Sequence, residues 1–130
     1  MSTPTSGLTP EQTARVAAMA AEWARTGETS ELLELLDHGL PVDLADPTGN
    51  SLIMLAAYHG HAKTVVALIE RGADVDARND RDQSPVAGAL FKGEQDVVRA
   101  LVAAGADLDA GTPTARQAAE MFGTQALLEP

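Results

Sequence analysis

The amino-acid sequence predicts an all-α protein, a solenoid of about four stacked helix-turn-helix units. Glycines recur every 33 residues in two separate series, and the same step relates aliphatic residues that have helical spacing. A fixed period of this length is typical of repeat proteins, in which each unit is too thin to bury its own apolar face. The residues that share the period are Gly27, Gly60 and Gly93; Gly39, Gly72 and Gly105; Leu35, Leu68 and Leu101; and Asp43, Asp76 and Asp109.

The first helix is predicted to begin at a capping box. Thr9 stands at the cap, Pro10 follows it, and Gln12 occupies the third helical position. We expect this helix to run to about Arg25, which makes it longer than its counterparts in later units. Residues 1–8 are expected to form a flexible tail.

The second unit shows the helix pair most clearly. Ser51 is a helix cap, and the short apolar helix after it should end at Gly60. A second helix should start near His61 and present Val65, Leu68 and Ile69 on one face. The Asp-, Asn- and Gly-rich segment between units has no helical period and is predicted to be a loop.

The last two units vary this pattern. Asp82 stands where the second unit has Gly49, and aspartate tolerates the left-handed backbone that such a turn requires. The fourth unit lacks three loop residues, and its second helix stops at Leu127 and Leu128. The predicted units are residues 9–45, 46–78, 79–111 and 112–130, with the first and last acting as caps.

Several residues of the second unit give the chain a specific resemblance to the ankyrin repeat family. They are Gly49, Ser51, Ile53, Ala56, Ala57, Gly60, His61, Val65, Leu68, Gly72, Ala73, Asp74 and Val75. The resemblance covers nearly the whole chain and implies helix-turn-helix units with short β-turn loops. It also implies that loop tips and the ends of the first helices bind a partner protein on a concave face.

These positions give a set of candidate partner-binding residues: Arg25, Thr48, Asn50, Tyr58, His59, Arg78, Asp80, Arg81, Phe91, Lys92 and Met121. Tyr58, Phe91 and Met121 occupy one repeat position and should form a row. Rings and methionines are enriched at interface centres, so an exposed row favours binding. The alternative, that Phe91 and Met121 pack inward, stays open at this stage.

Net charge and composition limit the classes of partner that the chain is expected to bind. The net charge of −10 disfavours nucleic acid and anionic membranes, and it would attract a protein with a basic surface. No stretch approaches the roughly 18 apolar residues of a membrane span, so a cytoplasmic protein is expected. The chain has no cysteine, which excludes disulfides and thiolate metal sites.

Neither a cofactor nor a metal is expected. His59 and His61 flank a glycine, but no third ligand accompanies them, and His61 resembles the structural histidine of ankyrin units. The acids that start at Asp74 fail the spacing of a calcium loop and are interpreted as solvating their loop. No histidine is placed as a base for a nucleophile, so the chain is not expected to be an enzyme.

Two further positions concern packing. Trp23 aligns with the small residues of later units and should fill space in the first, capping unit, with ligand binding as the alternative. Gly88 lies inside a predicted helix and marks either close packing or a small void.

We therefore expect a protein-binding module, such as an accessory or regulator of a neighbouring enzyme. The alternative is self-assembly, in which the shortened fourth unit leaves apolar surface on Val98, Leu101 and Val102 that pairs with another copy. A monomer is expected, and a homodimer is the outcome that the alternative predicts.

Overall fold

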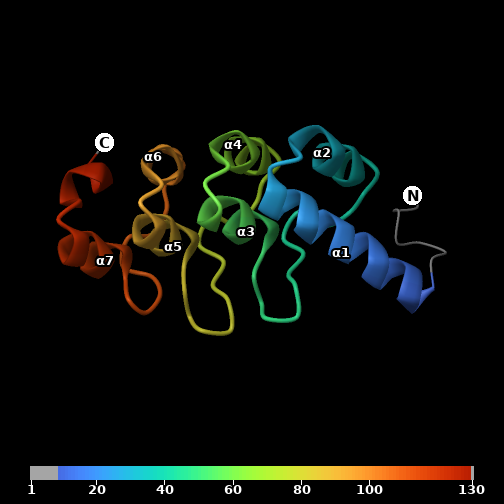
Figure 1. Cartoon of the computed structure of the whole chain (residues 1–130), viewed down its shortest axis with the longest axis horizontal. Helices are drawn as coiled ribbons and strands as arrows, with labels where there is room; N and C mark the ends of the chain where they lie inside the picture. The colour runs from blue at the N-terminus through green and yellow to red at the C-terminus, as the bar shows by residue number, and fades with distance from the viewer. Residues whose placement is uncertain (1–8, 130) are drawn as a thin grey trace.

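The computed structural model describes residues 9–129, in which helices follow one another in pairs (Figure 1). The tail predicted for residues 1–8 lies outside the described residues. Within them there are α-helices and one short 3-10 helix but no strand, so the predicted all-helical solenoid is confirmed. The elements are α1 (Pro10–Thr26), α2 (Thr29–Asp37), α3 (Leu52–Tyr58), α4 (Ala62–Glu70), α5 (Pro85–Lys92), α6 (Gln95–Ala103), α7 (Ala115–Phe122) and η1 (Gln125–Leu128).

The helices form two rows. The first helices α1, α3, α5 and α7 lie side by side, and α2, α4 and α6 form a second row, above the first in the view of Figure 1. The loops between units project from the first row on the side away from the second row. No helix among residues 9–129 is both long and apolar enough to cross a membrane.

The helix ends follow the sequence signals. Thr9 and Gln12 form the predicted capping box, and Ser51 accepts a hydrogen bond from the backbone N–H of Met54. Asp82 has a φ of 59°, so it does adopt the left-handed backbone in place of glycine. The start and end of each unit are thus set by local chemistry.

The core lies between the two rows and contains the periodic aliphatic residues. Leu68 and Leu101 are completely buried. Trp23 is half-buried against this core, as expected of a capping residue. A Cβ atom built on Gly88 would lie 3.1 Å from Cε of Met54, so this glycine marks close packing and not a void.

The aspartates after the second helices connect neighbouring units. Oδ1 of Asp43 accepts the backbone N–H of Asp74 at 2.8 Å, and Oδ1 of Asp76 accepts that of Asp107 at 2.7 Å. The interpretation of Asp74 and Asp76 as merely solvating their loop is therefore incomplete. The recurring aspartate stabilises the turn of the next unit by satisfying its backbone donor.

The C-terminal unit covers the surface that the self-assembly alternative requires. The 3-10 helix η1 packs on α6 and α7, and Leu128 is buried. Val98 and Leu101 are completely buried, and Val102 is half-buried. The expectation that Val98 and Leu101 remain exposed is wrong, because the short last turn still reaches across α6.

Candidate protein-binding site

Three large apolar side chains are exposed at the C-terminal ends of successive first helices. Tyr58 ends α3, and Phe91 and Met121 lie at the ends of α5 and α7, with exposed fractions of 38%, 59% and 65%. We call Tyr58, Phe91 and Met121 the apolar row. Their exposure excludes the alternative that Phe91 and Met121 are core residues.

Phe122 extends the apolar row. Its ring packs edge-on against Phe91, with ring centroids 5.3 Å apart and an interplanar angle of 83°, and 44% of the residue is exposed. Such T-shaped pairs stabilise the ring arrangement beyond simple area burial. The two rings therefore present one continuous apolar surface.

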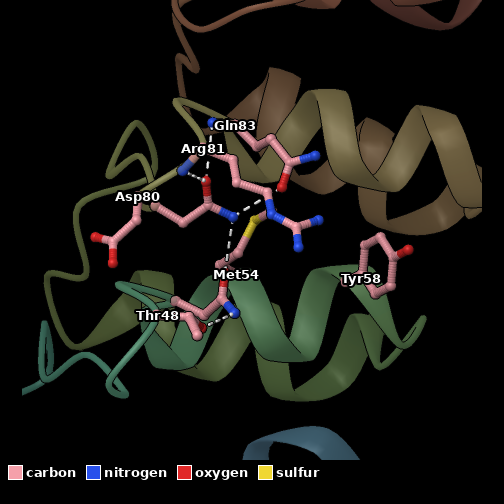
Figure 2. A pocket seen from close by; sticks show the side chains of 8 residues that line it. Thr48, Met54, Tyr58, Asp80, Arg81 and Gln83 are labelled. Atoms are coloured by element: carbon pink, nitrogen blue, oxygen red, sulfur yellow. Dashed lines mark hydrogen bonds between the residues drawn. The ribbon is translucent and has the colours of Figure 1, made fainter.

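Beside Tyr58, a depression of about 390 Å³ lies between two neighbouring loops and above α3 (Figure 2). We call it the loop groove. One wall comes from the loop that precedes α3 and the other from the loop that precedes α5. Its lining residues are Thr48, Asn50, Met54, Tyr58, Asn79, Asp80, Arg81 and Gln83.

Side-chain amides hold the two walls of the loop groove together. Nδ2 of Asn79 donates to Oδ1 of Asn50 and to Oε1 of Gln83, both at 2.8 Å (Figure 2). The backbone N–H of Asp80 donates to the carbonyl oxygen of Thr48 at 3.1 Å. Because the Asn79–Asn50 and Asp80–Thr48 bonds cross between units, the groove is formed before any partner arrives.

The first of these loops is also ordered internally by Asp46. Its Oδ1 accepts the backbone N–H groups of Thr48 and Asn50, each at 2.9 Å. Burial alone would raise the pKa of Asp46, but the hydrogen bonds from Thr48 and Asn50 outweigh it and hold the pKa below the ordinary value of 3.8. The carboxylate therefore stays charged and keeps the loop tip in place.

A second depression of about 250 Å³ continues from the loop groove toward α5. Tyr58 and Arg81 line both depressions, and Phe91 lies in the second. Gly88 contributes to its floor, where a Cβ atom would lie 3.1 Å from Cε of Met54 and 3.5 Å from Cδ1 of Tyr58.

Two basic side chains surround Tyr58. Nζ of Lys92 lies 5.1 Å from the centre of the Tyr58 ring, within the range of a cation–π contact. His59 packs edge-on against the same ring. Burial lowers the pKa of His59 below its ordinary value of 6.5, and the charges of His61, Lys92 and Arg25 lower it further, so the imidazole is mostly neutral near pH 7.

The structure brings together some of the predicted site residues and leaves others apart. Thr48, Asn50, Tyr58, Asp80, Arg81 and Phe91 share the two depressions. Arg25 forms an ion pair with Glu22 at 2.8 Å, and Arg78 forms one with Asp82 at 3.1 Å. Neither arginine lines one of the two depressions, and Met121 does not line either of them.

Some residues of the site were not predicted. Met54 is buried beneath the loop groove, and Asn79 joins its walls. The sequence held one signal for Met54, since it stands where the first and third units have Ala21 and Ala87. Phe122 shares a helix-end position with His59 and Lys92, so the family resemblance implies it as a partner-contacting position, but its packing against Phe91 could not be predicted from the sequence.

The histidines flanking Gly60 have distinct structural settings. Nε2 of His61 lies 2.7 Å from the carbonyl oxygen of Arg25 and so joins α4 to the end of α1, which confirms its structural role. Among residues 9–129, no three His, Cys, Asp or Glu side chains are grouped as metal ligands.

Comparison with known proteins agrees with this architecture. The family model for ankyrin repeats in three copies matches residues 17–112. A protein of Pseudomonas aeruginosa, named "Putative ankyrin repeat protein", is 55% identical over 42 residues, which are 32% of this chain. The match spans 25% of that relative. The chain belongs to the ankyrin repeat family, whose repeats are generally protein–protein interaction modules.

Proposed function

We propose that this chain binds a partner protein through the apolar row and the adjoining loop groove. The exposure of Phe91 and Met121 carries this proposal. Only 3% of the chain is aromatic, yet Tyr58, Phe91 and Phe122 are all exposed together on one side of the stack. Aromatic residues and methionine are enriched at the centres of protein interfaces, and exposed apolar clusters commonly mark interaction sites.

The polar surroundings of the row support the same proposal. An interface usually has an apolar centre and a polar rim. Here the hydrogen-bonded loops supply that rim next to Tyr58, and their order lowers the entropy that binding would cost.

Photo-crosslinking in the native cell tests where the partner sits. A photoreactive phenylalanine analogue is placed at Phe91, and in a second strain at Val66, an exposed apolar residue of α4 in the other helix row. We expect a covalent product containing a second protein from position 91 but not from position 66. A product formed only from position 66 would move the interface to the second helices.

A further inference from the structure

Six of the nine lysine and arginine residues form ion pairs. Within residues 9–129, the other three, Lys63, Arg81 and Lys92, have no carboxylate partner. This is notable in a chain with 19 acidic residues. Lys63 lies on α4 in the second helix row, whereas Arg81 and Lys92 both lie beside Tyr58.

Arg81 is placed to bind something outside the chain. Its side chain reaches from the loop over α3 and lines both depressions (Figure 2). Only its backbone N–H is bonded, to Oδ1 of Asn79, and its guanidinium donates no hydrogen bond to residues 9–129. A guanidinium has five donors in a planar fork that matches a carboxylate.

The one acid that lines the loop groove does not neutralise Arg81. The Asp80 carboxylate is turned toward the preceding loop, so that a Cβ atom on Gly49 would come within 2.5 Å of Oδ1 of Asp80. Figure 2 shows it on the side of the groove away from Tyr58, with the Arg81 guanidinium on the side toward Tyr58. The surroundings of Tyr58 are therefore locally positive although the whole chain carries a charge of −10.

We infer that the partner segment carries a carboxylate next to an apolar side chain, with the carboxylate held by Arg81 and the apolar group seated against Tyr58 and Phe91. This inference rests on the proposed function and specifies the partner's chemistry. A lysine or arginine in the same place would meet Arg81 and Lys92 as like charges, which favours an acidic segment over a basic one at this position. The many acids of α2, α4, α6 and the turns after them lie elsewhere on the chain.

Selection from a phage library of random peptides tests the inference. The best peptide is synthesised with its acidic residue and, separately, with the matching amide. Binding of both forms is measured by fluorescence anisotropy to the wild type, to Arg81→Gln and to Lys63→Gln, the matched control. Lys63 and Arg81 are both exposed and without ion partners, so both variants should fold.

We expect selected peptides to place Asp or Glu within two residues of an aromatic or aliphatic residue. The Arg81→Gln variant should bind the acidic peptide about 10-fold or more weakly, because a charge-assisted hydrogen bond is lost. This variant should also bind the acid and amide forms of the peptide with equal affinity. Lys63→Gln should still favour the acidic form as the wild type does. This pattern assigns the carboxylate to Arg81.

Two kinds of result overturn the inference and separate it from the proposed function. The inference alone is refuted if the selected peptides are basic or neutral and bind Tyr58→Ala more weakly than the wild type. It is also refuted if Arg81→Gln still binds the acidic form of the peptide more tightly than the amide form. Peptides whose binding is unchanged by Tyr58→Ala and Phe91→Ala, or a library that yields no binder, count against both.

Discussion

At the scale of single residues, Asp82 shows how a repeat position is kept without its glycine. The residue has a φ of 59°, a region that costs most side chains about 1–2 kcal/mol. Its carboxylate offsets this by accepting Oγ1–H of Thr112 at 2.8 Å and pairing with Arg78. The side chain thereby also joins the third unit to the fourth.

The backbone and side-chain effects at Asp82 can be separated by two substitutions. Asp82→Ala and Asp82→Gly both remove the carboxylate, but only glycine adopts the left-handed backbone without strain. In urea titrations, we expect the free energy of unfolding of the alanine variant to be about 1 kcal/mol lower than that of the glycine variant. Equal stabilities would show that the loop relaxes and that φ is not constrained there.

At the scale of elements, α4 is supported on several sides. It contacts α3 of its own unit as well as α2 and α6 of the neighbouring units, and Leu68 is completely buried among them. Stability in such a stack comes largely from the interfaces between neighbouring units.

Truncation of Leu68 tests this arrangement. Leu68→Ala should lower the free energy of unfolding by about 2–5 kcal/mol, because it removes buried methyl groups and leaves a cavity. Val66→Ala, two residues away but 42% exposed, should change it by less than about 0.5 kcal/mol. Similar losses for both variants, measured by chemical denaturation, would mean that the apolar face of α4 is assigned incorrectly.

Much of each element could be predicted from the sequence because its limits are set locally. Thr9 and Ser51 cap helices through atoms three residues away, and the 33-residue period aligns the apolar faces. The path of η1 could not be predicted, because it depends on contacts with α6. Likewise the exposure of Phe91 depends on its neighbours, and the missing ion partner of Arg81 depends on distances between loops.

At the scale of the whole molecule, different helices cap the two ends of the described stack. The long α1 packs over α2 and α3 at one end, and α7 with η1 packs on α5 and α6 at the other (Figure 1). η1 packs on α6, and Val98 and Leu101 are completely buried while Val102 is half-buried, so most of the surface considered for self-assembly is removed from solvent.

Size-exclusion chromatography with light scattering tests this consequence. We expect a monomer of 13.5 kDa at all accessible concentrations, since the main apolar residues of α6 already have partners within the chain. The negative net charge should also oppose association of identical copies, most strongly at low salt. A concentration-dependent mass of twice this value would restore the self-assembly alternative.

The most direct test of the proposed interface is the effect of Tyr58→Ala on the affinity for the protein crosslinked from position 91, measured by isothermal titration calorimetry. Tyr58 lines both depressions and contacts Lys92, so it should behave as an interface hot spot. We predict a Kd at least about 30-fold higher, equivalent to about 2 kcal/mol, with helical content and melting temperature nearly unchanged. Val66→Ala should bind as the wild type does. A folded Tyr58→Ala variant with unaltered affinity would contradict the proposed interface.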